Sequence, residues 1–179
     1  MEVRRNLIVG QSGGPTAAIN ASLAGVYAGA KKLGFKKVFG MRYGIEGFLK
    51  EKIVDLDDTL SSTINLELLK RTPSSYLGSC RYKLSEPKAG NEVYEKIFEI
   101  LNKYEIEIFI YIGGNDSMDT IKKLSEYAKL VGSSVKFVGI PKTIDNDLPV
   151  TDHTPGFGSA AKYIATSMTE IIRDSNVYD

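Results

Sequence analysis

Short apolar runs that end at a glycine-rich turn and pass into helical spacing recur along this chain, and no other feature of the sequence constrains its fold as strongly. Residues 6–9 are a short apolar run, residues 10–15 form the turn, and the alanine-rich residues 16–33 have the composition of a helix. The same pattern predicts the remaining elements in chain order, a strand at 37–41, a helix at 92–104, a strand at 106–112, a helix at 117–130, a strand at 135–140 and a helix at 156–174. Strands that alternate with helices indicate a parallel sheet covered on both faces.

The predicted fold class is therefore α/β, a Rossmann-like sandwich built on a parallel sheet with helices on both faces. A chain of 179 residues is long enough for one good core, so we expect one domain over residues 1–179. Residues 46–87 are harder to assign, with a helix expected around 60–71 and a polar loop through Arg81. The last predicted helix runs almost to Asp179 with no strand after it, which indicates a chain truncated before a second α/β domain.

Charge and composition argue against several classes of function. Twenty-three basic and twenty-two acidic side chains leave a net charge of +1 without long runs of either sign, so we expect no nucleic-acid or membrane partner. The only cysteine, Cys80, and the only histidine, His153, exclude a disulfide framework and argue against a Cys/His zinc site. We interpret Cys80 as a packing residue and His153 as structural or solvent-facing. With no signal pattern and no apolar stretch near about 20 residues, we expect a cytoplasmic protein.

The first glycine turn carries Gly13 and Gly14 between a predicted strand and a predicted helix. Glycines at such a turn let backbone N–H groups approach a phosphate, and the helix dipole adds to the attraction. The alternative is a plain turn that needs glycine for its backbone angles and Pro15 to open the helix. The residues alone leave both interpretations open.

The second glycine turn has the same position after residues 106–112 and adds polar side chains, namely Gly114, Asn115, Asp116 and Ser117. Oxygen ligands at a phosphate-binding edge indicate magnesium that is held jointly with phosphate oxygens. The alternative is that Asp116 or Ser117 only caps the first N–H groups of the next helix.

The third loop follows residues 135–140 and contains Lys142, Thr143, Asp145 and Asp147. These side chains can supply a general base, a metal contact and a cation for developing phosphate charge. Asp and Asn are also ordinary turn residues, which is the alternative here. Three polar loops at one edge of one parallel sheet favour a site over three independent turns.

In these motifs the chain resembles the phosphofructokinase family. The resemblance rests on Ser12-Gly13-Gly14-Pro15 with Ile19-Asn20, Leu77-Gly78-Ser79-Cys80-Arg81, the Gly113 to Ser117 loop, and Pro141 to Asp147 with Thr151-Asp152 and Gly156-Phe157. These motifs follow the family's order over nearly the whole chain, and Thr-Ile-Asp-Asn-Asp is the most specific of them. The resemblance implies a phosphoryl transfer of glycolysis, to the 1-hydroxyl of fructose 6-phosphate.

The resemblance also implies roles for individual residues. Asp145 is the catalytic base, Thr143 helps to hold the reacting groups, and Asp147 supports a network of Mg²⁺ and phosphate. The donor phosphates contact Gly13, Gly14, Gly114, Ser117 and Arg81, whose guanidinium fork suits phosphate oxygens.

Two positions bear on the donor. ATP-dependent members of the family typically have glycine at the positions of Asp116 and Lys142, whereas pyrophosphate-dependent members have aspartate and lysine, so the resemblance favours pyrophosphate over ATP. Asp116 would occupy space that an ATP α-phosphate needs, and Lys142 offers a cation to a compact donor.

The chain departs from the family pattern at Asn115, where many members carry an aspartate associated with magnesium, so Asp116 is a candidate to share that duty. The family's residues that bind the sugar phosphate would lie beyond Asp179, so we expect the 179 residues alone to be inactive and the complete enzyme to be a homo-oligomer. One rival interpretation is an isolated phosphate-binding domain. A dehydrogenase is disfavoured because the first turn lacks the Gly-x-Gly-x-x-Gly pattern.

Overall fold

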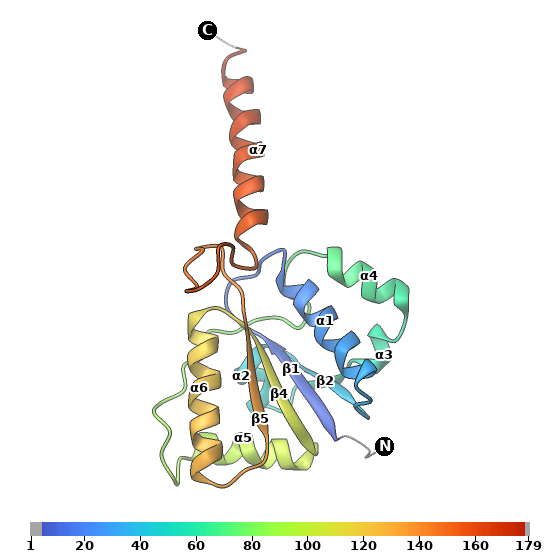
Figure 1. Ribbon diagram of the computed structural model, residues 1–179, viewed down its shortest axis with the longest axis vertical. Coiled ribbons are helices and arrows are strands. Elements are labelled where there is room, and N and C mark those ends of the chain that lie inside the picture. Colours follow the sequence, from blue (N-terminus) through green and yellow to red (C-terminus); the bar gives the residue numbers. More distant parts are fainter. Residues whose placement is uncertain (1–4, 178–179) are drawn as a thin grey trace.

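Five strands form one sheet in the order β3-β2-β1-β4-β5 in the computed structural model, which describes residues 5–177 (Figure 1). The strands are β1 (Asn6–Gln11), β2 (Val38–Met41), β3 (Ile53–Asp55), β4 (Ile106–Gly113) and β5 (Lys136–Pro141). The helices are α1 (Ile19–Lys32), α2 (Gly44–Leu49), α3 (Asp57–Leu60), α4 (Thr63–Arg71), α5 (Glu92–Lys103), α6 (Asn115–Leu130) and α7 (Phe157–Ser175). The predicted α/β class with a strand-helix alternation is confirmed.

The strands β2, β1, β4 and β5 are parallel, as expected, but β3 pairs with β2 in the antiparallel direction. Only the six-residue helix α2 separates β2 from β3, and a parallel return needs a longer crossover. The sequence did not predict β3, α2 or α3, because each is too short to show a period. The helix expected at 60–71 is two helices, since Ser62 has extended backbone angles (φ −76°, ψ 128°).

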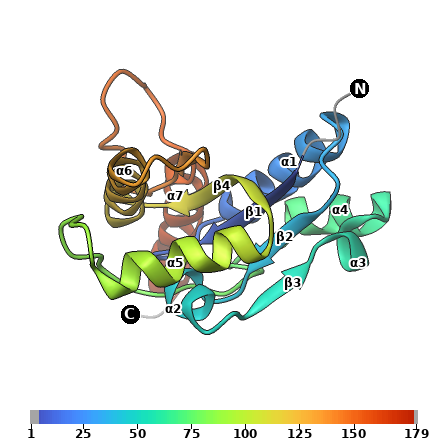
Figure 2. The ribbon, with the colours of Figure 1, turned by 90° about the horizontal axis from the view of Figure 1, so that it is seen from below.

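Two apolar layers hold the sheet between its helices. One face packs against α2, α5 and α6, and the other packs against α1, α3 and α4 (Figure 2). The strongly apolar β4 contributes to both layers, through Phe109 and Tyr111 on one side and Ile110 and Ile112 on the other. Because β1, β4 and β5 pair in parallel, their carboxyl ends lie at one edge of the sheet.

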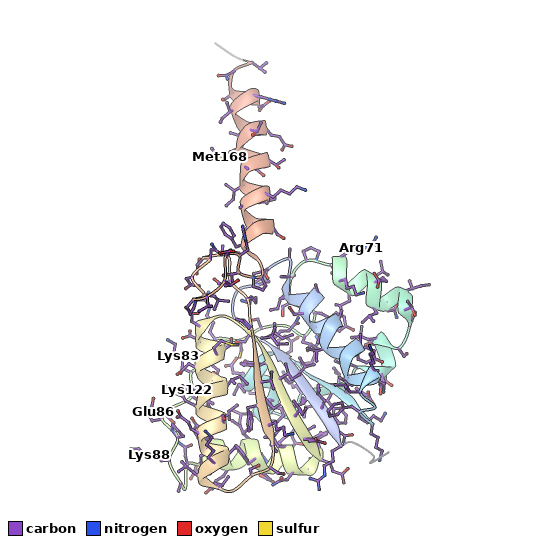
Figure 3. All side chains as sticks on the ribbon, viewed as in Figure 1. Arg71, Lys83, Glu86, Lys88, Lys122 and Met168 are labelled. Atoms are coloured by element: carbon purple, nitrogen blue, oxygen red, sulfur yellow. The ribbon has the colours of Figure 1, made fainter. Side chains whose placement is uncertain are left out.

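The last helix, α7, differs from the expected cover for the sheet. It leaves the carboxyl edge and extends away from the other elements, and Met168 projects from it into open space (Figures 1 and 3). None of its described residues is buried. Within residues 5–177, no helix is both long and apolar enough to cross a lipid bilayer.

Candidate functional site

The three polar loops meet at the carboxyl edge of the sheet and surround one cavity of about 560 Å³. The cavity is lined by Ser12, Gly13, Gly14, Pro15, Thr16, Cys80, Arg81, Tyr82, Lys83, Gly114, Asn115, Asp116, Ser117, Lys142, Thr143, Ile144 and Asp145. A fourth segment, residues 80–83, closes it. Every residue expected at the donor site therefore lines this cavity, and Asp147, expected near the metal, lies just outside it.

A larger hollow of about 1000 Å³ lies at the opposite edge, between α5 and α6, and contains none of these loops. Its charged lining consists of Arg5, Glu95, Glu99 and Glu105. Three carboxylates against one guanidinium repel a phosphate, so the smaller cavity is the better anion site.

Gly13 adopts a left-handed backbone conformation (φ +76°) that side chains disfavour. A Cβ atom at Gly13 would lie 3.2 Å from the Nζ atom of Lys142. Glycine therefore serves two purposes at this turn, since it permits the backbone angle and leaves room for the lysine.

Lys142 lies at the floor of the cavity and is only 4% exposed. Its ammonium group donates a hydrogen bond of 2.5 Å to the carbonyl oxygen of Gly14. It forms no ion pair with any residue in the part of the chain that the structure describes. Burial lowers the pKa of Lys142 from the usual lysine value. A buried cation without a countercharge is costly, so this arrangement favours the binding of an anion.

The second loop opens α6, and the capping alternative is not supported there. The N-cap position is Gly114, and no side chain of the described residues forms a cap hydrogen bond at it. The carboxylate of Asp116 lies 3.3 Å from the ammonium group of Lys83, and both side chains are about three-quarters exposed (74% and 78%). Since an exposed ion pair is weak, Asp116 remains free to face a ligand.

The third loop is held by its central residue, Asn146. This residue has a left-handed conformation (φ 55°), accepts a hydrogen bond from the Thr154 N–H at 2.9 Å and donates one to the Asp152 carbonyl at 3.2 Å. The turn interpretation is thus right for Asn146. The carboxylates on either side of it, Asp145 and Asp147, are exposed and stay available.

The residues expected at a metal site come together only in part. Asn115 donates a hydrogen bond of 3.2 Å to a carboxylate oxygen of Asp147, whereas Asp116 pairs with Lys83. No group of three or more acidic, cysteine or histidine side chains with metal-binding geometry occurs in residues 5–177. A magnesium ion would therefore depend on phosphate oxygens for part of its coordination, which is its usual behaviour at phosphate sites.

Three residues that line the cavity escaped the sequence analysis, namely Thr16, Tyr82 and Lys83. Lys83 projects beside α6 (Figure 3), and it lies two residues after Arg81 in a segment that belongs to no helix or strand. A segment without a period gives no local signal for which of its side chains reach the cavity. Cys80 is buried 3.7 Å from the Tyr111 hydroxyl, in agreement with its interpretation as a packing residue. His153 is exposed, as expected of a solvent-facing residue, and its ring lies 5.8 Å from that of Phe157.

Comparisons with known proteins agree with this geometry. A family model described as phosphofructokinase matches residues 6–177. A curated relative from Xanthomonas campestris pv. campestris, named pyrophosphate–fructose 6-phosphate 1-phosphotransferase, is 47% identical over 94% of this chain and 40% of its own length. A solved pyrophosphate-dependent phosphofructokinase from Nitrosospira multiformis has a TM-score of 0.86 and 42% identity, over 94% of this chain and 41% of that chain.

An ATP-dependent 6-phosphofructokinase from Vibrio cholerae is similar at 33% identity, over 92% of this chain and 47% of its own length. It is thus more distant than the relative from Xanthomonas. The chain spans about 40% of the length of that first relative.

Proposed function

Because the chain belongs to the phosphofructokinase family, we propose that it is the donor-binding domain of an enzyme that transfers a phosphoryl group from pyrophosphate to the 1-hydroxyl of fructose 6-phosphate. In this proposal residues 1–179 form the N-terminal, phosphoryl-donor-binding α/β domain. The reaction needs positioning and charge stabilisation more than covalent help from the protein.

One observation carries the proposal, the buried and unpaired cation of Lys142 next to Gly13 and Gly14. An anionic donor supplies the countercharge that the described residues lack. Arg81 and Lys83 also line the cavity and add positive charge to it. Pyrophosphate, a compact and highly charged anion, suits such a site better than a neutral or extended ligand.

Asp145 is the proposed general base. Its carboxylate takes the proton of the 1-hydroxyl while the hydroxyl oxygen forms a bond to a phosphorus atom of pyrophosphate. The bond from that phosphorus to the bridging oxygen breaks, and inorganic phosphate leaves. Thr143, whose hydroxyl accepts a hydrogen bond of 3.1 Å from the Asp145 N–H, keeps this carboxylate at the cavity rim. Lys142 and Arg81 stabilise the charge that develops on the transferred group.

Magnesium is the proposed cofactor, and the donor set at this edge fits it. Asn115 and Asp147, which are already joined by a hydrogen bond, offer oxygen ligands, and Asp116 adds a third by releasing Lys83. The bound ion would neutralise phosphate charge during the transfer. The chain's own task here is to hold these oxygens at the open end of the donor cavity.

The choice of pyrophosphate over ATP rests on Asp116 and Lys142. The exposed carboxylate of Asp116 stands at the rim, where a donor extended by a nucleoside would have to pass it. Like charges at that rim oppose ATP, whereas the buried Lys142 attracts the donor phosphates. The identity to the pyrophosphate-dependent relative, higher than that to the ATP-dependent one, supports the same choice.

The test is an assay of the full natural gene product with fructose 6-phosphate, Mg²⁺ and either pyrophosphate or ATP, in which fructose 1,6-bisphosphate is measured directly. We expect rapid turnover with pyrophosphate and little with ATP. If the enzyme prefers ATP, the assignment of pyrophosphate as donor is rejected, but the proposed phosphoryl transfer to fructose 6-phosphate is not. Binding of pyrophosphate without any turnover would leave the rival interpretation, a phosphate-binding domain without activity.

A further inference from the structure

Gln11, the last residue of β1, is completely buried directly before the first glycine loop. Its side-chain amide uses all of its hydrogen-bonding capacity. The nitrogen donates to the Ile19 carbonyl at 3.1 Å and to Oδ1 of Asn20 at 3.0 Å. The oxygen accepts from the Leu77 N–H at 2.8 Å and lies 3.0 Å from the Ser75 hydroxyl, whose one hydrogen it shares with the Gly78 carbonyl at 2.8 Å. A buried side chain with four partners has one available orientation.

Asn20, at the start of α1, forms further hydrogen bonds to the segment that contains Ser75 and Leu77. Its side-chain oxygen also accepts from the Tyr76 N–H at 2.9 Å, and its nitrogen donates to the Thr72 carbonyl at 2.9 Å. Residues 72–77 belong to no helix or strand, so their backbone groups need partners from elsewhere. The two amides supply them.

The segment held by Gln11 continues directly to Arg81. After Leu77, the Ser79 hydroxyl donates to the Gly13 carbonyl at 2.6 Å. The Cys80 carbonyl accepts from the Gly13 N–H at 3.5 Å and from the Ser12 hydroxyl at 3.4 Å. Arg81 is the next residue, and its side chain lines the donor cavity. The segment that presents Arg81 is therefore attached to Gln11 and Asn20 at one end and to the first glycine loop at the other.

We propose that Gln11 is a positioning residue, which acts through residues 72–80 to hold Arg81 at the phosphate donor. The inference rests on the proposed function, since it takes the donor as the ligand of Arg81. Gln11 itself does not line the cavity in the part of the chain that the structure describes. Its contribution is to set the distance between Arg81 and the glycine loop, whose own place is set by β1.

A purely structural role for Gln11 is the competing explanation, because any satisfied buried amide stabilises a fold. The two explanations differ in what happens when Arg81 is removed. If Gln11 acts through Arg81, its substitution should no longer affect donor binding in an Arg81→Ala background. If Gln11 only stabilises the fold, its effect should be the same in both backgrounds.

The experiment is a double-mutant cycle in the full natural gene product, with Gln11→Met, Arg81→Ala and the double variant. Gln11→Met keeps the side-chain length but removes all four hydrogen bonds. We expect each single variant to raise the KM for pyrophosphate by on the order of 10-fold, typical of a lost charged hydrogen bond. The kcat of Gln11→Met should fall no further than that of Arg81→Ala, because Gln11 acts only through Arg81 and the base is untouched. The KM of the double variant should match that of Arg81→Ala within about 2-fold. A double variant whose increase in KM is the product of the two single increases would overturn the proposal.

Ser75→Ala provides a milder variant in case Gln11→Met does not fold. It removes a half-buried hydroxyl that lies 3.0 Å from the Gln11 oxygen and 2.8 Å from the Gly78 carbonyl. Because both contacts hold the segment that leads to Arg81, it should raise the same KM in the same Arg81-dependent way. The matched control is Ser133→Ala, which removes a hydroxyl that accepts from the Val135 N–H at 3.3 Å, near the opposite edge of the sheet. The control should leave the KM unchanged.

A second readout separates this inference from the proposed function. In Gln11→Met, hydrogen exchange of the Tyr76 and Leu77 amides and trypsin cleavage after the exposed Arg81 should both accelerate, whatever the enzyme's donor is. If the parent enzyme uses ATP instead, the donor proposal fails and the same cycle with ATP still tests Gln11. Unchanged exchange and cleavage, or an enzyme that binds neither donor, would reject the positioning role.

Discussion

The ammonium group of Lys142 and the carbonyl oxygen of Gly14 form a 2.5 Å hydrogen bond across the donor cavity. These residues are 128 positions apart in the sequence, so the contact ties the loop after β1 to the loop after β5. The carbonyl is a neutral partner and leaves the positive charge of Lys142 uncompensated. A bound phosphate is a stronger partner for this ammonium group than the carbonyl is.

Replacement of Lys142 by methionine should weaken the use of pyrophosphate by about 2 to 5 kcal/mol in kcat/KM, the loss expected for a buried charged contact. The stability of the protein without donor should not fall, because an apolar side chain of similar length replaces an unpaired buried charge. Kinetics and urea unfolding measure the two effects. Lys136→Met is the control, since Lys136 is an exposed lysine of β5, the strand that precedes Lys142, and should change neither quantity. A parent-like kcat/KM for Lys142→Met would contradict the site.

The pH dependence follows from the pKa of Lys142, which burial lowers below the ordinary lysine value of 10.5. Between the lowered pKa and that value the unfolded chain binds more protons than the folded protein, so folding stability without donor should rise with pH. A bound anion raises the pKa of Lys142, so pyrophosphate affinity should fall over the same range. Calorimetric titration and urea unfolding across alkaline pH test both trends, and Lys142→Met should flatten them.

Replacement of Gly13 by alanine should disrupt the packing of the first glycine loop against the side chain of Lys142. The left-handed angle of Gly13 costs a side chain about 1 to 2 kcal/mol of stability, and the new Cβ would lie 3.2 Å from the Lys142 ammonium. Gly90→Ala is a matched control, because Gly90 has nearly the same angle (φ +77°) with no neighbouring atom within 4 Å of a Cβ. Both variants should lose similar stability, but only Gly13→Ala should lose pyrophosphate affinity. Equal affinities would show that this loop does not bind the donor.

Asp145→Asn should lower kcat by on the order of 10²-fold or more, because the amide keeps the size of the carboxylate but cannot accept the proton. Its KM for pyrophosphate should change little, since Asp145 acts on the acceptor hydroxyl. Steady-state kinetics separate the two parameters. Asp174→Asn, which removes an exposed carboxylate from α7, is the control. Largely intact turnover in Asp145→Asn would assign the base to another residue.

The sequence was sufficient for the parts of the fold that have a strong period. The apolar run of β4 and the glycine turns after β1 and β4 placed the sheet and its carboxyl edge, and with them the loops of Gly13, Asp116 and Lys142. β3 was missed because three residues with a charged end, Asp55, show no period. α7 was predicted as a helix, but its position away from the sheet depends on tertiary contacts that a local pattern does not contain.

The candidate site, like the fold, was predicted only in part from the sequence. Motifs located the residues, but the contacts between distant loops, such as Asn115 with Asp147 and Asp116 with Lys83, follow from the order of the strands. The capping interpretation of Asp116 was wrong because Gly114 takes the N-cap position. The role of Gln11 was invisible in the sequence, since its partners at residues 75 and 77 lie far along the chain.

Asp116→Gly should make ATP a measurable donor without abolishing the use of pyrophosphate. The substitution removes both the side chain and the negative charge that oppose a nucleotide at the cavity rim, while Lys142 still attracts the donor phosphates. Glycine near the start of α6 also costs helix stability, by about 1 kcal/mol. Asp119→Gly controls for that cost, because Asp119 is an exposed carboxylate of the same helix and does not line the cavity. Kinetics with both donors should show ATP turnover in Asp116→Gly alone. If Asp116→Gly rejects ATP as the parent does, the refusal of ATP has another cause than this carboxylate, even though the family assignment stands.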